Sequence, residues 1–366
     1  MAISNHGEDN LHEEPAHHEQ MIAIVRASGN EQLPADQKEQ LWQTIAADIN
    51  RKPRVIRWQL LKAAAVILVL ITAGVWSWQQ LRSHKESAVV AFAAGQQSIA
   101  AGGASRVILG NNKQLVLKGS RTAITYGAGG NSLRVDSQTV QQAVAENSLT
   151  FNTLLVPYGN TAFLQLSDGS KVWLNAGSRL IYPIAFTEGK REVYLEGEAY
   201  FDIAADPAKP FSVYAADLKV AVLGTAFNVS AYKDDPFRQV VLASGAVQLK
   251  PFRGKDTNTD PVTLKPGNKA VYAENAGMAV VNVDISEYIS WKEGIIVAAH
   301  MPLYEILKKL SRYYNQPIET DTKSGNETFS GKLDLQKSVD DVLNIIAATT
   351  SLNYQKQGKK IIFKTR

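Results

Sequence analysis

Three carboxylates lie within one short stretch of the chain, at Glu196, Glu198 and Asp202. Two carboxylates that face each other across a cleft could hydrolyse a glycosidic bond. Residues two apart on a strand point to the same side, so Glu196 and Glu198 would share one face with Tyr194. A solvated strand face explains this pattern. The sequence therefore predicts exposed carboxylates here and no catalytic pair.

Other catalytic and metal-binding chemistries lack their residues. The chain has no cysteine, contains neither G-x-S-x-G nor H-E-x-x-H, and carries only His300 beyond His84. It also lacks phosphate-binding loops and zinc-ligand spacings. The remaining histidines lie in the polar N-terminal tail without partners at a ligand spacing: His6, His12, His17 and His18. The sequence predicts no enzyme, no catalytic residue, no cofactor and no metal site.

An apolar run from Leu60 to Trp78 is the strongest structural signal. Nineteen residues of helix span about 28 Å, close to the ~30 Å hydrocarbon core of a bilayer. Basic residues are denser before this run than after it, which places the N-terminus in the cytoplasm. A buried core helix and a cleavable signal peptide, ending near Ala91 or Ala93, are the alternatives. The prediction is a single transmembrane helix over 60–78.

The tail before the span, residues 1–57, carries one amphipathic pattern. Asp36 and Glu39 have the spacing of a helix N-cap and its third residue. Apolar side chains then recur at helical spacing: Leu41, Trp42, Ile45 and Ile49. A short helix with an exposed apolar stripe requires a partner. The membrane surface, the rest of the tail or another cytoplasmic protein could supply it.

Composition indicates a folded protein that does not bind nucleic acid. The chain has 366 residues, 45% hydrophobic and 20% charged, with a net charge of +4. Much of the basic excess lies beside the predicted span and at the C-terminal end, so it reflects membrane topology. Without cysteine the folds depend on packing alone, which fits a bacterial envelope protein.

Residues 154–273 alternate between apolar and polar side chains in many short runs separated by turn residues. This pattern predicts a β-sandwich or a jelly-roll-like barrel, with a domain over 151–275. Residues 88–150 are expected to be a connecting β segment. It contains a predicted hairpin over Val107–Ser120, which a second predicted hairpin over Phe163–Ser178 echoes, and the pattern leaves internal duplication open.

The last part of the chain, residues 291–366, mixes both periods. Strand patterns enclose helical spacings that begin at Pro302 and at Ser338, in the order β-α-β-β-α-β-β. The sequence therefore predicts a small α+β module with two helices on one sheet. The whole protein is expected to be mainly β, with this α+β module at its end and a short helical cytoplasmic tail.

Four segments in order resemble the FecR family of anti-sigma regulators between Val156 and Leu249: VPYGNTAFLQLSDGSKVWLNAGSRLIYP, EVYLEGEAYFDIAADPAKPFSV, VLGTAFNV and LASGAVQL. The tail from Trp291 to Arg366 resembles the small domain that follows in bacteroidete-type members, and also the short signalling domain of secretins and TonB-dependent transporters. The motif positions are interpreted as turns, close-packing sites and core residues: Asp168, Gly169, Trp173, Gly197, Glu198, Tyr200, Phe201, Gly224, Phe227 and Gly245.

The resemblance implies a regulator in the inner membrane whose C-terminal part lies in the periplasm. Its partners would be an extracytoplasmic-function sigma factor inside and the signalling domain of a TonB-dependent outer-membrane transporter outside, and it would control uptake genes for iron or glycan. The tail is shorter than in many members. Its sigma-binding residues would be Leu41, Trp42, Ile45 and Ile49.

A different class of function also fits the pattern. The β domain could be a membrane-tethered module that binds glycan or mediates adhesion, with an idle cytoplasmic tail. Exposed aromatic rings would then form a platform for sugar rings. Tyr158, Tyr182 and Tyr194 are the candidates in the β domain.

Overall fold

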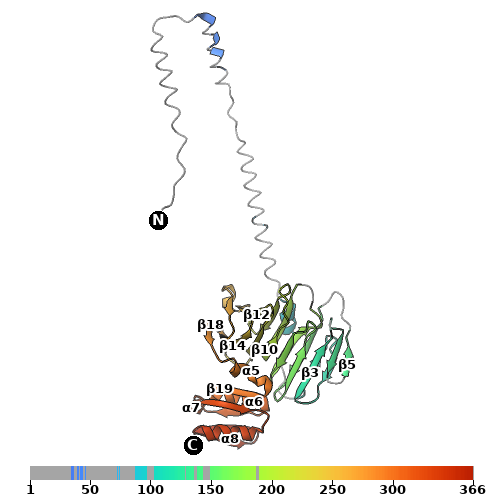
Figure 1. Cartoon of the computed structure of the whole chain (residues 1–366), viewed down its shortest axis with the longest axis vertical. Helices are drawn as coiled ribbons and strands as arrows, with labels where there is room; N and C mark the ends of the chain where they lie inside the picture. The colour runs from blue at the N-terminus through green and yellow to red at the C-terminus, as the bar shows by residue number, and fades with distance from the viewer. Residues whose placement is uncertain are drawn as a thin grey trace. The chain divides into compact units, whose positions relative to one another are not determined.

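The computed structural model (Figure 1) describes residues 87–96, 103–127, 129–135, 138–142, 149–186 and 189–365, and ten positions between residues 34 and 74. The chain divides into two compact units, Met1–Lys85 and Glu86–Arg366. In the first unit, the described positions from 35 to 46 are helical. The predicted span, residues 60–78, lies outside the described residues apart from two positions. Among the residues that are described, no helix has the length and apolarity to cross a membrane.

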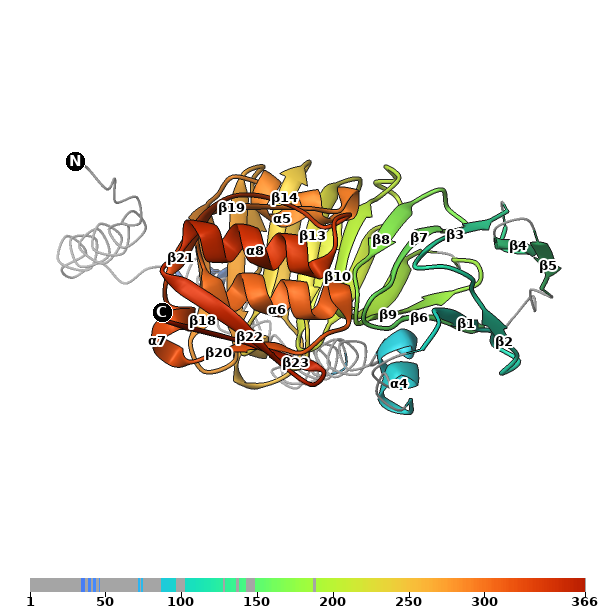
Figure 2. The same ribbon diagram turned by 90° about the horizontal axis from the view of Figure 1, so that it is seen from below.

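Two β-sheets make up most of the second unit (Figures 1 and 2). Residues from both sheets form one apolar core. The first sheet contains, in spatial order, β2 (Gln114–Val116), β1 (Arg106–Ile108), β6 (Phe151–Val156), β9 (Ser178–Pro183), β10 (Arg191–Asp202), β11 (Phe211–Ala215), β12 (Leu218–Val222), β15 (Val247–Pro251) and β16 (Val262–Leu264).

The second sheet runs from β5 at one end to β18 at the other (Figure 1). It contains, in spatial order, β5 (Gln138–Gln141), β4 (Ser132–Val135), β3 (Arg121–Tyr126), β7 (Thr161–Gln165), β8 (Lys171–Leu174), β10, β13 (Ala226–Ala231), β14 (Arg238–Ser244), β17 (Asn268–Ala273) and β18 (Gly277–Asn282). Neighbours are antiparallel except β3–β7 and, in the first sheet, β10–β11.

Strand β10 belongs to both sheets and turns from one to the other at Gly197. Its first part pairs with β9 and β11, and its part from Gly197 onwards pairs with β8 and β13. Gly197 has a φ of +97°, and a Cβ atom there would lie 2.5 Å from Ser178 Oγ. Glycine alone tolerates both this backbone conformation and this close approach. The glycine therefore marks the corner of the sandwich.

The strands alternate as the sequence predicts, with Val193, Leu195, Ala199 and Phe201 of β10 buried in the core. The prediction of a mainly β protein with helices near the C-terminal end is confirmed. Both predicted hairpins exist, as β1–β2 and β7–β8. The expected connecting segment supplies β1 to β5, which pair into both sheets and contribute to the same core as the strands after residue 150.

A short helix that the sequence did not predict, α4 (Ala88–Ala94), covers the outer side of the first sheet. Its residues Val89, Val90 and Ala93 are buried against Phe151 and Ile181. The hydroxyl of Ser87, just before the helix, donates a hydrogen bond of 2.7 Å to Glu192 on β10. The start of the second unit is thereby attached to the sandwich.

The C-terminal module, defined as residues 295–365, has its own apolar core. Its elements are β19 (Ile295–Pro302), α6 (Leu303–Tyr314), β20 (Ile318–Thr320), α7 (Thr322–Gly325), β21 (Thr328–Asp334), α8 (Val339–Thr349), β22 (Leu352–Gln357) and β23 (Lys360–Thr365). Three short helical segments precede it: η1 (Lys255–Asn258), α5 (Ser286–Ile289) and η2 (Ser290–Glu293).

The prediction of two helices on one sheet is wrong, because the module contains two small sheets. Strand β19 pairs with β21, while β20, β23 and β22 form the other sheet. Between β20 and β21, the side chain of Asp321 accepts a hydrogen bond from the Ser324 N–H and caps the one-turn helix α7. This turn leads the chain away from β20 before β21 begins. Helices α6 and α8 share one core with both sheets.

Candidate functional site

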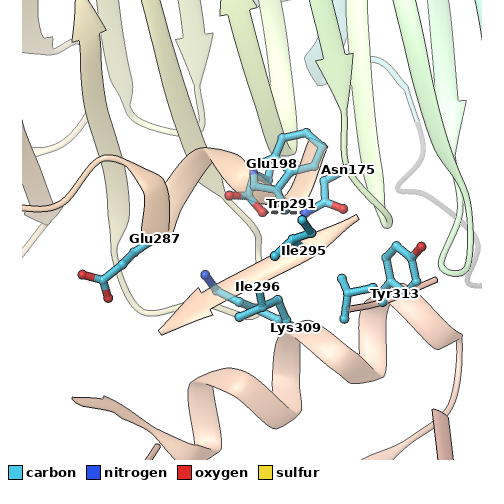
Figure 3. Close-up of a pocket in the computed structure, with 9 residues that line it drawn as sticks. Asn175, Glu198, Glu287, Trp291, Ile295, Ile296, Lys309 and Tyr313 are labelled. Carbon is cyan, nitrogen blue, oxygen red and sulfur yellow. Dashed lines mark hydrogen bonds between the residues drawn. The ribbon is translucent and has the colours of Figure 1, made fainter. Parts of the chain in front are cut away.

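A buried carboxylate, Glu198, connects the sandwich to the segment that leads into the C-terminal module. It projects from β10, with only 7% of the residue exposed. Its two oxygens accept hydrogen bonds from Asn175 Nδ2 at 2.8 Å and from Asn228 Nδ2 at 3.0 Å. Asn228 in turn accepts a bond of 3.1 Å from the indole Nε1 of Trp291 in η2. Figure 3 shows Trp291 and Asn175 beside Glu198.

The exposure predicted for the two glutamates is wrong, since Glu196 is only 6% exposed. Both side chains leave the outer face of β10, but other segments cover them. Glu196 forms ion pairs with Arg179, at 2.7 Å, and with Lys233. Each carboxylate is thus occupied by its own donors. Among the described residues there is no group of His, Cys, Asp and Glu that could hold a metal ion.

A second contact is made by Arg312, a buried arginine on α6. Its Nη2 donates to Asp234 and to Asp235 of the β13–β14 turn, at 2.9 Å each. Its guanidinium lies over the ring of Tyr232, 3.6 Å from the ring centre. Lys308, one turn earlier on α6, adds ion pairs of 3.2 and 2.5 Å to the same two carboxylates. A planar cation with several donors suits this combination of two carboxylates and a ring.

The charges of this contact stabilise each other. Burial alone would lower the pKa of the Arg312 guanidinium, but Tyr232, Asp235 and Asp234 outweigh it and raise that pKa above its usual value. Burial would likewise raise the pKa of Asp234, yet Arg312 and Lys308 together hold it below the ordinary aspartate value. Both groups therefore remain charged across the neutral pH range.

The main chain contributes a third contact, between the β6–β7 loop and the end of α6. The Gly159 N–H donates to the carbonyl oxygen of Arg312 at 2.9 Å. A Cβ atom at Gly159 would come within 3.2 Å of Asn315 Cβ. At the same end of α6, the Tyr313 hydroxyl accepts a bond of 3.4 Å from Arg121. We refer to the Glu198 network, the Arg312 contact and this main-chain contact together as the junction.

Aromatic side chains line the outer face of the second sheet next to the junction. Phe163, Trp173 and Tyr200 lie on adjacent strands with ring centres 5.1 and 5.6 Å apart. The ammonium of Lys292, in η2, lies 4.8 Å from the Tyr200 ring centre and 5.9 Å from that of Trp173. The interpretation of Trp173 as a core residue is wrong, because its side chain is on the outer face and only partly buried. Tyr200 is buried, but on the same outer face.

The other motif residues lie in the core or at turns. Phe201 and Phe227 stack inside the sandwich, with ring centres 5.1 Å apart. Asp168 accepts a 2.8 Å bond from Arg191. Gly169 lies in the β7–β8 turn and Gly245 lies in the β14–β15 turn. Gly224 lies close to the main chain of Ala205.

A small pocket lies between the sandwich and the C-terminal module at the junction (Figure 3). Glu198, Asn175 and Trp291 line one side, while Ile296 and Lys309 line the other. On the sandwich side of the pocket, Glu198 is held by Asn175, so its carboxylate serves to connect neighbouring segments.

The sugar-binding platform of the alternative function lacks one of its three rings. Tyr182 is fully buried, and its hydroxyl lies 3.1 Å from that of Tyr126 inside the sandwich. Tyr158 and Tyr194 are partly buried. The ring of Tyr182 is therefore unavailable to a ligand. Its neighbour Tyr126 is buried as well, and this burial raises the pKa of Tyr126 to about 12.

The predicted sigma-binding residues lie almost entirely outside the described part of the chain. Trp42 alone is described, in a helical segment with 61% of the residue exposed. Leu41, Ile45 and Ile49 lie outside the described residues.

Comparison with known proteins identifies the two parts of the second unit. The family model described as FecR protein matches residues 152–248, and the model described as FecR, C-terminal matches residues 295–363. Crystal structures at 1.65 and 2.50 Å resolution of a proposed anti-sigma factor from Parabacteroides distasonis ATCC 8503 are similar to this chain at 31% identity. The alignments cover 58% and 59% of this chain and 99% of that one, each with a TM-score of 0.53.

The chain belongs to the FecR family. No curated protein sequence matches this FecR-family chain. The two matched segments are the two domains that the junction joins, and Glu198 and Arg312 lie in one of them each. The resemblance inferred from the sequence motifs is confirmed.

Sequence reasoning missed most of the junction. No contact was predicted for Asp234, Asp235, Arg312 or Tyr232. Arg312 is buried on a helix whose other buried residues are apolar, and the sequence alone does not show this burial. Its two aspartate partners lie more than seventy residues earlier in the chain.

Proposed function

We propose that this protein is a single-pass anti-sigma regulator of the inner membrane. The cytoplasmic tail, residues 1–57, holds an extracytoplasmic-function sigma factor. The second unit lies in the periplasm and receives a signal from a TonB-dependent outer-membrane transporter, which controls transcription of uptake genes for iron or glycan. The observation that carries this proposal is the order of the parts: a nineteen-residue apolar run is followed by both FecR-family domains.

The architecture supports a receiver with no chemistry of its own. Glu196 and Glu198, the two acidic residues considered above as a catalytic pair, are each engaged by donors of the protein. The solved relative, at 31% identity, is itself a proposed anti-sigma factor. A regulator of this kind needs surfaces that bind proteins and domains that can change their contacts.

The receiving step in this proposal is strand addition. An exposed sheet edge takes up a strand of the transporter's signalling domain, so main-chain hydrogen bonds supply affinity and alternate side chains supply specificity. Release of the sigma factor then follows from a conformational shift or from proteolysis near the span.

On the cytoplasmic side, the proposal assigns binding to the apolar stripe that contains Trp42. An exposed tryptophan on an amphipathic helix is a strong anchor for a protein groove. The other members of the stripe are Leu41, Ile45 and Ile49. Replacing Trp42 by alanine is expected to weaken sigma-factor binding by tenfold or more, whereas the neighbouring Gln43→Ala serves as a matched control and should have little effect.

The test is expression of the target genes in cells. Deletion of residues 1–57 should either raise expression, if the tail only inhibits the sigma factor, or abolish it, if the tail also activates. The W42A variant should shift expression in the same direction as the deletion, and Q43A should not. Unchanged expression after the deletion would contradict the regulatory role.

A further inference from the structure

One sheet edge in the described region lacks the usual protection against pairing with another chain. Edge strands are normally short, charged or interrupted by bulges. In the first sheet, β2 and β16 have three residues each, and β5 of the second sheet has four, with polar residues at both ends. The fourth edge strand, β18, has six residues, GMAVVN, with neither charge nor proline.

The edges of the C-terminal module are protected in these ways. Strand β19 contains a register shift between Ala298 and Met301, and β20 has only three residues. Strand β21 carries Gly331 and Lys332. On β22, Lys356 forms an ion pair of 2.6 Å with Asp340 of α8. By elimination, β18 is the longest uncharged and regular edge strand among the described sheets.

The alternation of hydrogen-bonded and non-hydrogen-bonded residue pairs along β17 and β18 determines which main-chain groups of β18 face outwards. The strand pairs along its whole length with β17, and Val283 just beyond it donates to Gly267 at 2.9 Å. Alternate residues of an antiparallel pair bond inwards, so Val281 and Ala279 follow Val283. The N–H and C=O groups of the residues between them therefore point to the open edge: Met278, Val280 and Asn282.

The side chains of β18 are also exposed on both faces. Val280 is 42% exposed on one face and Val281 is 48% exposed on the other. The strand forms one end of the second sheet, opposite β5 in both views (Figures 1 and 2). An added strand would continue the sheet and cover both valines. β-branched side chains pack well across such a pair.

The charges around the strand indicate what kind of segment fits. Glu274 precedes β18 and Asp284 follows it, and both are exposed. The strand between them is uncharged, so a complementary segment has β-branched residues at its centre and basic residues near its ends. One strand edge buries far less than the roughly 1,200 Å² of a stable protein interface. This favours a strand that belongs to a larger partner with further contacts over self-pairing of two β18 strands.

We propose that β18 is the acceptor edge of the periplasmic unit, and that an extended segment of the transporter's signalling domain, apolar in its centre and basic at its ends, pairs with Met278, Val280 and Asn282. This inference rests on the proposed function, which supplies the partner. It adds the position of the contact, which lies on the sandwich at the end of the FecR-domain sheet, and the chemistry of the segment that binds there.

The test uses the full chain in phospholipid nanodiscs and the purified signalling domain of a TonB-dependent transporter from the same organism. Val280→Pro removes one outward N–H without removing a bond of the β17–β18 ladder. Val116→Pro is the matched control, because Val116 on β2 is also an exposed edge residue, and Leu117 N–H bonds to Ser105, which turns the Val116 N–H outwards. V280P is expected to weaken binding at least tenfold and V116P to leave it unchanged.

A second pair of variants guards against misfolding. Val280→Lys and Val116→Lys each place a charge on an edge and keep the main chain intact. V280K should also weaken binding tenfold or more with an unchanged melting temperature, and V116K should not. Hydrogen exchange should slow at Met278, Val280 and Asn282 when the signalling domain is added.

Three outcomes would overturn the inference. Equal binding by V280P, V280K and wild type would place the contact elsewhere and leave the proposed function intact. Slow exchange at these amides without partner, together with a dimer that V280K converts to monomer, would show that a second copy fills the edge. Failure of the wild-type chain to bind the signalling domain would contradict the transporter partnership of the proposed function, and this inference with it.

Discussion

The sandwich and the C-terminal module differ in how they are held together and in how they are held to each other. The sandwich has one large core that draws residues from both sheets, and the module has a separate core between two helices and two small sheets. The junction between them consists mainly of polar contacts, at Glu198, Arg312 and Gly159. Polar contacts between domains can be exchanged for water at lower cost than an apolar core. We therefore expect each fold to persist when the junction is disrupted.

The difference assigns separate tasks to the two kinds of contact. The cores fix the shape of each domain, whereas the junction decides whether the domains stay together. Under the proposed function, the adjustable contacts are those at Arg312 and Glu198. Substitutions in a core should consequently lower the free energy of unfolding, whereas substitutions in the junction should weaken docking of the module.

The largest effect is expected in the sandwich core. Phe201→Ala removes a ring that stacks on Phe227 and should lower the free energy of unfolding by about 3–5 kcal/mol, since large buried side chains leave cavities. Urea unfolding of residues 86–366 measures this change. The exposed Val116→Ala should alter the same free energy by less than about 0.5 kcal/mol. A loss no larger for F201A than for V116A would contradict the assignment of a core.

A smaller effect, with a different signature, is expected at Arg312. Arg312→Ala leaves Asp235, which is itself mostly buried, without its guanidinium partner, and should weaken docking of the module by about 3 kcal/mol. Both domains should stay folded, so limited proteolysis should cut between residues 276 and 294 while circular dichroism remains unchanged. Arg312→Lys should rescue only in part, because lysine lacks the planar fork. The exposed Lys323→Ala is the control. Loss of strand signal in R312A would show that the junction and the folds are inseparable.

Glu198→Gln tests the polar network from the sandwich side. The carboxylate accepts bonds from two asparagine Nδ2 groups, and glutamine would turn an NH2 group towards one of them. The expected cost to docking is about 1–3 kcal/mol. The indole resonance of Trp291 reports the change, because Trp291 bonds to Asn228 in the same network. An unmoved resonance together with wild-type docking would remove Glu198 from the junction.

The smallest effect is a dependence of docking on acid. The pKa of Asp234 lies below its ordinary value in the folded protein, so its contribution is present above the usual carboxyl pKa of about 4 and is lost as the pH falls through the lower folded value. Asp234 is partly exposed, which limits the contribution to less than about 1 kcal/mol. Docking of wild type and Asp234→Asn should differ at pH 6 and converge near pH 2. A difference that grows towards low pH would have the wrong sign.

Local patterns in the sequence predicted the β architecture, both hairpins and the helices of the module, because alternation and turn residues act over neighbouring positions. They failed where distant segments meet. The face of Glu198 was predicted correctly, yet its burial depends on Asn175, Asn228 and Trp291, which the chain brings together from three other elements. Tyr182 was likewise predicted to be exposed, but it is buried against Tyr126 of the distant strand β3.

The candidate site was also predicted only where neighbouring residues determine it. Of the junction residues, the family motifs included only Glu198, which they marked as a structural position. They said nothing of Arg312 or of the aspartates that it binds, because a buried ion pair between elements far apart in the chain leaves no periodic trace. The open edge at β18 also required the register of its neighbour, β17, before its outward groups could be named.

The central claim, that a signal crosses a membrane from the two-domain unit to the tail, is tested most directly by labelling single cysteines. The natural chain has none, so Ser4→Cys and Lys359→Cys each provide one unique site. In intact cells, a maleimide that cannot cross the inner membrane should label Lys359→Cys and should reach Ser4→Cys only after lysis. Equal labelling of both positions before lysis would place the two ends in one compartment and contradict the account.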